Sequence, residues 1–226
     1  MKKVWKKIFA SLLIAAMLIP NAFALTIEYI DPGKSFSDEI IKAETVSSWA
    51  EKEVTAAELS GLVPNMTDLP GYQDTITREQ FAELVVRLVT VVLGEAPKPD
   101  ASLSFTDCSN PSVMLAASAG IVNGVGNDLF APKSYTNREQ IAVMLHRAIA
   151  YISARNGINV IPEPASIYDF TDKHNVSSWA REGVGALAAN GIMKGTSKVT
   201  LSPKDSCTVE QSILLVYRLY QSYQGQ

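Results

Sequence analysis

Apolar side chains recur at intervals of three and four residues in several stretches of the chain, which is the spacing of one buried face of an α-helix. The pattern is clearest at residues 81–92 and 141–149. A third stretch at 215–219 keeps it, although Ser212 stands where the other two begin with a large apolar residue. The pattern predicts three amphipathic helices.

Each of these helices is preceded by the same kind of start signal. A Thr or Asn is followed three residues later by Gln, at 77–80, 137–140 and 208–211. The first side chain accepts from a backbone N–H of the first turn, and the Gln accepts from the backbone N–H of the cap residue. We therefore expect each helix to begin directly after its cap residue.

The start signal belongs to a longer pattern that occurs three times. In order, each copy has Phe-x-Asp, a Gly followed by two apolar residues, and the start signal. The first two landmarks begin at Phe36 and Gly61, at Phe105 and Gly120, and at Phe170 and Gly191. A Trp-Ala pair stands twelve residues before the glycine in the first and third copies. A helix-loop-helix unit is thus repeated three times, with insertions between the copies.

The predicted fold class is mostly α, with three helix-loop-helix repeats in a compact pseudo-threefold arrangement. A single helix pair buries too little surface to be stable alone, whereas three pairs can share one core. The glycine after each first helix suits a left-handed helix end. The predicted domains are repeat 1 at 25–94, repeat 2 with its preceding linker at 95–156, and repeat 3 with its preceding linker at 157–226.

Residues 1–24 are predicted to be a secretory signal peptide. Four lysines precede a twelve-residue apolar run at 8–19, and Ala22-Phe23-Ala24 fits the small-x-small cleavage pattern. An uncleaved anchor is the alternative, although a spanning helix needs about 20 apolar residues. After cleavage, 16 basic and 23 acidic residues would give a formal charge of −7. This charge argues against general nucleic-acid binding, and we expect no membrane contact after cleavage.

Few residues are available for metal or nucleophilic chemistry. The chain has two histidines and two cysteines, whereas structural zinc usually needs four such ligands. His146 and His174 have no acid–base partner at a motif spacing. A disulfide between Cys108 and Cys207 is an open alternative, because an exported chain meets oxidising conditions. We expect no cofactor, no metal site, no catalytic residue and no enzyme activity.

The ordered phrases resemble the surface-layer homology (SLH) domain family, whose repeats run Phe-x-Asp, Trp-Ala, Gly-Ile-x-x-Gly, Phe-x-Pro and Thr-Arg-Ala-Glu. The second copy has Gly120-Ile121-Val122-Asn123-Gly124, Phe130-Ala131-Pro132 and Arg138-Glu139. The third keeps Trp179-Ala180, Gly191-Ile192-Met193-Lys194-Gly195 and Leu201-Ser202-Pro203, and the first keeps Trp49-Ala50 and Thr77-Arg78. The resemblance covers nearly the whole chain after residue 24.

This resemblance implies non-covalent anchoring of a secreted protein at the bacterial cell wall or S-layer. The implied partner is an anionic, pyruvylated-type secondary cell-wall polysaccharide or modified peptidoglycan, bound in grooves between repeats. Arginine suits a ketal carboxylate because it donates two parallel hydrogen bonds, a Trp face suits a sugar, and glycine permits close approach. The glycan-binding residues predicted in this way are Trp49, Arg78, Gly124, Arg138, Trp179 and Gly195.

The copies depart from the motif at different places. The third has Val209 where the motif arginine belongs, the first has Pro64-Asn65 in place of the second glycine, and the second lacks Trp-Ala. We expect the first helix of the second copy to be shorter and to begin near Pro111. At most two grooves are expected to be competent, one with Arg78 and one with Arg138.

Purely structural roles are the alternatives for the same residues. The two tryptophans are also candidates for the core, and the two arginines are candidates for ion pairs on the helix surface. The alternative function is a surface protein-interaction or assembly module, whose degenerate repeats hold a partner protein instead of glycan. Another surface protein, carried as cargo, is compatible with either function.

Overall fold

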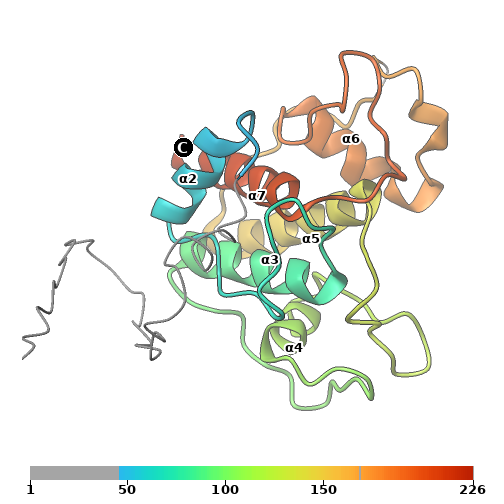
Figure 1. Cartoon of the computed structure of the whole chain (residues 1–226). Coiled ribbons are helices and arrows are strands. Elements are labelled where there is room, and N and C mark those ends of the chain that lie inside the picture. The colour runs from blue at the N-terminus through green and yellow to red at the C-terminus, as the bar shows by residue number, and fades with distance from the viewer. Residues whose placement is uncertain (1–45, 168, 226) are drawn as a thin grey trace, which may run out of the picture. The chain divides into compact units, whose positions relative to one another are not determined.

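The computed structural model of the protein describes residues 46–167 and 169–225 (Figure 1). The α-helices in these ranges are α2 (Glu51–Leu59), α3 (Arg78–Leu93), α4 (Pro111–Ser118), α5 (Arg138–Asn156), α6 (Arg181–Ala189) and α7 (Val209–Gln224). Two 3-10 turns, η2 (Lys173–Asn175) and η3 (Ser178–Ala180), precede α6. This part of the chain has only isolated β-bridges, so the mostly α prediction is confirmed. The predicted signal peptide lies outside the described residues.

The three long helices α3, α5 and α7 begin where their start signals predict. Thr77 Oγ1 accepts from Gln80 N at 3.3 Å, and Gln80 Oε1 accepts from Thr77 N at 2.9 Å. The same reciprocal pair of bonds starts α5 and α7. The capping residues therefore satisfy backbone donors that the first turn would otherwise leave open.

The short helices α2, α4 and α6 end as predicted. Each is followed by a glycine in the left-handed region, with φ of 68° at Gly61, 68° at Gly120 and 71° at Gly191. The second short helix begins at Pro111, and the Asn110 side chain accepts from Ser112 N at 2.9 Å. Proline suits this position because its missing N–H would have had no helical partner.

Each short helix packs against a long helix from the copy before it. α4 packs against α3, α6 against α5, and α2 against α7, so that the first copy is joined to the last. The helix pairs that form the interior are therefore shared between neighbouring copies. One connected core results, and it contains the fully buried side chains of Leu88, Leu145 and Leu219.

Backbone hydrogen bonds join the three segments before the long helices into a closed ring. Ile76 N donates to the Cys207 carbonyl at 3.0 Å, Cys207 N donates to the Thr136 carbonyl at 3.4 Å, and Thr136 N donates to the Ile76 carbonyl at 3.2 Å. Each of these residues directly precedes the cap of a long helix. The ring thus holds the starts of α3, α5 and α7 close together.

The two cysteines are free, so the disulfide left open by the sequence is not formed. Cys207 lies in the ring and is fully buried, whereas Cys108 is partly exposed. Burial raises the pKa of the Cys207 thiol from 9.0 to about 11, with a smaller opposing effect from Arg138. Cys207 is therefore an un-ionised part of the core at neutral pH.

No helix within the described ranges is long and apolar enough to cross a membrane.

Candidate functional site

Arg138, the first residue of α5, fixes a loop of the third copy. Its Nε donates to the Leu201 carbonyl at 2.8 Å, and its Nη2 donates to the Lys194 carbonyl at 2.6 Å. The residue is only 6% exposed. Because these bonds join residues 56 and 63 positions apart, Arg138 connects two copies as well as lining the surface between them.

Arg78, the first residue of α3, holds the corresponding loop of the second copy. Its Nε donates to the Phe130 carbonyl at 3.0 Å and its Nη2 to the Asn123 carbonyl at 2.9 Å. The guanidinium carbon also lies 4.7 Å from the centre of the Phe130 ring. Burial lowers the pKa of Arg78, while the nearby Asp107 carboxylate opposes that shift. Both motif arginines therefore have a structural role beside any contact with a ligand.

The glycines predicted to line the site are required by the loops themselves. A Cβ at Gly195 would lie 2.5 Å from the Ser197 and Thr200 carbonyl oxygens and 2.9 Å from the Phe170 ring. At Gly124 the corresponding distances are 2.7 Å to the Leu129 carbonyl and 2.9 Å to the Phe105 ring. The loops close so tightly over these two phenylalanines that no side chain fits at either glycine.

A hollow of about 440 Å³ brings Trp49, Arg138 and Gly195 together, one residue from each copy. We call it the Trp49 groove. Its other lining residues are Lys194, Thr196, Gln211, Leu214, Leu215 and Arg218. Trp49 is 59% exposed, so the core role considered for this ring is wrong. The groove thus combines an exposed indole with cationic side chains.

The other three predicted residues, Arg78, Gly124 and Trp179, occupy the corresponding elements of the neighbouring copies. Arg78 is bonded to Asn123, the neighbour of Gly124. Trp179 lies in η3, which packs against α5, and it is 58% exposed, so a core role is wrong for it too. These three residues, together with Asn123 and Arg147 of α5, occupy the sequence positions that line the Trp49 groove, and we call this set of five the Trp179 surface.

Two arginines near the sites, Arg147 and Arg218, are not among the residues predicted from the sequence. Each stands nine residues after the first residue of its long helix, Arg138 in α5 and Val209 in α7. Arg218 lines the Trp49 groove. The Asn123 amide oxygen, when oriented to satisfy its neighbours, accepts from Arg147 Nη1 at 3.3 Å. Alignment of the three long helices on their caps is the signal that could have found both residues.

The third interface between copies, where α3 packs against α4, has a different chemistry. Val209, in the place of the motif arginine, is 3% exposed. The Glu83 carboxylate accepts from Thr67 N at 2.9 Å, from Thr67 Oγ1 at 2.5 Å and from Asn110 Nδ2 at 2.6 Å. Asn110 Nδ2 also donates to Glu79 at 3.0 Å. The protein's own groups therefore occupy this interface with a carboxylate, and the motif arginine is missing there. Arg87 of α3 stands at the helix position of Arg147 and Arg218, and its Nε donates to the Gly61 carbonyl.

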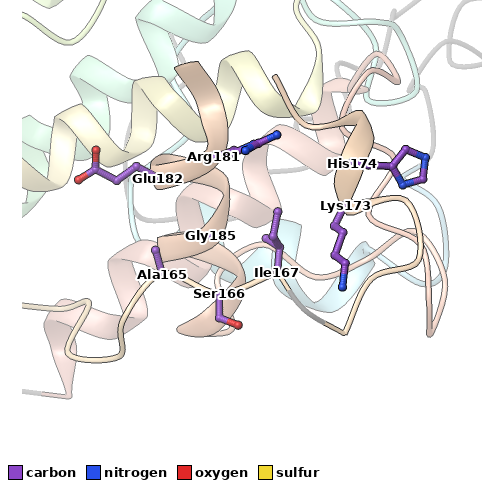
Figure 2. Close-up of a pocket in the computed structure, with 8 residues that line it drawn as sticks. All are labelled: Ala165, Ser166, Ile167, Lys173, His174, Arg181, Glu182 and Gly185. Carbon is purple, nitrogen blue, oxygen red and sulfur yellow. The ribbon is translucent and has the colours of Figure 1, made fainter. Parts of the chain in front are cut away.

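A second hollow, of about 460 Å³, is lined by none of the six predicted residues. It lies between α6 and the segments on either side of residue 168, and Figure 2 shows Glu182 pointing away from its centre. Its lining residues are Ala165, Ser166, Ile167, Lys173, His174, Arg181, Glu182 and Gly185. Within the described ranges no group of three His, Cys, Asp or Glu residues could hold a metal ion.

The fold and the grooves define a helical repeat protein whose copies meet at its surface. Comparison with known families identifies the repeats, because the S-layer homology domain matches residues 106–142 and 169–208. The chain therefore contains S-layer homology domains, in its second and third copies. Such domains are cell-wall anchoring modules, so these two indicate that the chain associates with the cell surface.

Three curated relatives are similar to a larger part of the chain. It is 24% identical over 173 residues to an amylopullulanase of Thermoanaerobacterium thermosulfurigenes and 24% identical over 180 residues to exoglucanase XynX of Acetivibrio thermocellus. It is 28% identical over 165 residues to a surface layer protein of Brevibacillus choshinensis. The matches cover 76%, 76% and 69% of this chain but only 9%, 15% and 14% of the respective relatives.

Proposed function

We propose that the chain anchors non-covalently to a bacterial cell wall by binding an anionic glycan between its repeats. The observation that carries the proposal is the Trp49 groove, in which Trp49, Arg138 and Gly195 converge from three copies. An exposed indole supplies an apolar platform for a sugar face, and Lys194 and Arg218 add positive charge. The proposed partner is a pyruvylated-type secondary cell-wall polysaccharide or modified peptidoglycan.

The arrangement of charge supports an anionic ligand. The whole chain has a formal charge of −3, yet Arg138, Lys194 and Arg218 gather in one groove. Guanidinium groups pair well with a carboxylate because they present parallel N–H donors. We include in the proposal export by a signal peptide at 1–24, an anchoring role without catalysis, and the possibility of a surface protein as cargo.

We further propose that the copies are related by a pseudo-threefold axis through the backbone ring. The equivalent hydrogen bonds of Ile76, Thr136 and Cys207 support it. On this arrangement the Trp49 groove and the Trp179 surface are equivalent sites. The third interface is the degenerate one, since Val209 replaces the motif arginine, the Trp-Ala pair is missing and the Glu83 carboxylate is present, so that Arg87 alone corresponds to the arginines of the other two sites.

Sedimentation with purified wall sacculi from the bacterium that produces the protein tests this function. The chain from residue 25 onward is expected to co-sediment, and the double variant Trp49→Ala, Trp179→Ala is expected to bind at least about tenfold more weakly. Leu59→Ala is the matched control, because Leu59 is 86% exposed and lies outside the groove lining. Equal sedimentation of the double variant and the parent would overturn the proposed sites.

Treated sacculi separate the ligand classes. Hydrofluoric acid removes polysaccharide attached through phosphodiesters, so loss of binding after this treatment indicates the polysaccharide, and retention indicates peptidoglycan. Protease treatment tests the alternative function. Binding that disappears from protease-treated sacculi would show that the chain holds a surface protein instead of glycan.

A further inference from the structure

The two candidate sites differ at the position four residues after each tryptophan. This position is Glu53 in α2, beside the Trp49 groove, and Gly183 in α6, beside the Trp179 surface. The neighbouring long helix has an arginine at the same place in both cases, Arg218 in α7 and Arg147 in α5. The sites therefore share an arginine but differ in whether an acidic residue faces it.

In the Trp49 groove the arginine is paired within the protein. Arg218 Nη2 lies 2.8 Å from Glu53 Oε2, and the two side chains are 21% and 31% exposed. Arg218 Nε also donates to Glu53 Oε1, at 3.4 Å. A ligand carboxylate approaching Arg218 therefore meets a guanidinium whose charge is already balanced by a partly buried acid.

In the Trp179 surface the equivalent position has no acid. A Cβ at Gly183 would lie 3.2 Å from the Ala142 carbonyl and from Val143 Cα, and 3.3 Å from His146 Cβ. The helices α5 and α6 are thus close at this point, and a longer side chain would require them to shift by a few tenths of an ångström. Within the described ranges the ion pairs found do not include Arg147.

Two guanidinium groups instead bond uncharged oxygens of one residue in the Trp179 surface. Arg78 Nη2 donates to the Asn123 backbone carbonyl at 2.9 Å, and Arg147 Nη1 donates to the Asn123 side-chain oxygen at 3.3 Å in the amide orientation that satisfies its neighbours. Asn123 brings the two cations to one loop without neutralising either. Asp107 does lie near Arg78, but its carboxylate oxygens accept from Phe130 N and Ala131 N, both at 2.8 Å.

The aspartate near the motif arginine does not distinguish the Trp49 groove from the Trp179 surface, because both sites have one. Asp172 in the third copy occupies the place that Asp107 has in the second, and it accepts from Leu201 N at 2.9 Å and Ser202 N at 2.8 Å. Two charges distinguish the sites. Glu53 faces Arg218 in the Trp49 groove alone, and Lys194 stands in that groove where the Trp179 surface has the neutral Asn123.

We propose that Glu53 acts as an internal competitor for Arg218, so that the Trp49 groove binds a carboxylated sugar more weakly than it would without this carboxylate. This inference rests on the proposed function, because it concerns one of the same sites. An anionic ligand in the Trp49 groove must share Arg218 with Glu53, or displace it.

Tryptophan fluorescence can follow each site separately. Of the three tryptophans in the chain, Trp5 falls in the predicted signal peptide, so residues 25–226 contain only Trp49 and Trp179. Trp179→Ala leaves Trp49 as the reporter of its groove, and Trp49→Ala leaves Trp179. The ligand for both titrations is a hexoside carrying a 4,6-linked pyruvate ketal, with the ketal methyl ester as the uncharged control.

Adding Glu53→Gln to the Trp179→Ala protein is expected to tighten the Kd of the Trp49 groove at least about fivefold, because one unit charge about 4 Å away contributes about 1 kcal/mol even at the dielectric constant of water. In the Trp49→Ala protein the same substitution is expected to leave the Kd unchanged. Thermal unfolding of all four proteins checks that each is folded.

The outcomes distinguish the proposed glycan binding from the proposed role of Glu53. If neither single-tryptophan protein responds to the ketal, the proposed function fails, and this inference fails with it. If the proteins respond to the ketal but Glu53→Gln leaves the affinity of the Trp49 groove unchanged or weaker, glycan binding stands and the role of Glu53 is overturned. Weaker binding after Glu53→Gln would mean that Glu53 positions Arg218 for the ligand.

Discussion

Ser47 and Glu210 are 163 positions apart and form two hydrogen bonds. Ser47 N donates to Glu210 Oε2 at 2.9 Å, and Ser47 Oγ donates to Glu210 Oε1 at 2.8 Å. Ser177 makes the same pair of bonds to Glu139, both at 3.0 Å. In both cases a glutamate in the first turn of a long helix thus accepts hydrogen bonds from the segment before a short helix. At Glu210 this contact joins the first copy to the last.

Glu210→Gln is expected to lower the free energy of unfolding by about 2 kcal/mol, because it replaces charge-assisted hydrogen bonds at a buried carboxylate with neutral ones. Glu210 is 3% exposed. Urea denaturation followed by circular dichroism measures the change, and Glu182→Gln, at an exposed position, is the control. Equal midpoints for the two variants would contradict the prediction.

Arg138→Ala is expected to loosen the loop at residues 194–201, since it removes the donors that reach the Lys194 and Leu201 carbonyls. Unsatisfied buried carbonyls cost roughly 1–3 kcal/mol each. Hydrogen–deuterium exchange should become faster in this loop, and Arg138→Lys should restore little, because a single ammonium lacks the planar fork. Unchanged exchange in Arg138→Ala would show that the loop is held by other contacts.

Gly195→Ala is expected to be more damaging than Gly191→Ala in the same copy. The new Cβ at Gly195 would collide with two carbonyl oxygens at 2.5 Å, whereas Gly191 has φ of 71° but open space around it. We expect a loss of about 1 kcal/mol at Gly191 from the left-handed backbone and of about 3 kcal/mol at Gly195 from the collision. Thermal unfolding of the two variants compares them directly, and a reversed order would be inconsistent with this loop.

The stability of the protein should fall as the pH rises from about 9 to about 11. The pKa of Cys207 is raised to about 11 by burial, so in this range the folded protein keeps a thiol proton that the unfolded chain loses. The contribution of Cys207 to stability is full below the unfolded pKa and is lost through the folded one, by about 3 kcal/mol in total. Urea midpoints measured across this range check it.

Cys207→Ala is the control for this pH effect. It removes the titrating group, so the part of the decline due to Cys207 should disappear between pH 9 and 11, even though the variant is less stable overall. Tyr72 and Tyr223, whose pKa values burial raises from 10.0 to about 12, add a decline from about pH 10 upward in both proteins. An identical pH profile in the two proteins would show that Cys207 is not responsible.

The long helices could be predicted from sequence because their signals are local. Thr77 and Gln80 are three positions apart and bond to each other, so reading the chain in order is enough to find the start of α3. The same holds for the glycine after each short helix. These features need no knowledge of the rest of the fold.

The partners of the site residues could not be found in this way. Arg138 was recognised from its motif, but its two carbonyl partners lie 56 and 63 positions further on, and its near-complete burial depends on them. Arg218 and Glu53 meet only because α2 packs against α7. Such contacts depend on how the copies close on one another, which the sequence pattern does not specify.

The contact between α2 and α7 also affects how the protein would respond to mechanical load. These helices come from opposite ends of the described chain and lie against each other (Figure 1). Tension between the two ends would therefore act first on this contact and on the bonds between Ser47 and Glu210. Trp49 and Arg218 stand at the same contact, so the Trp49 groove should be the first site to lose its shape under tension.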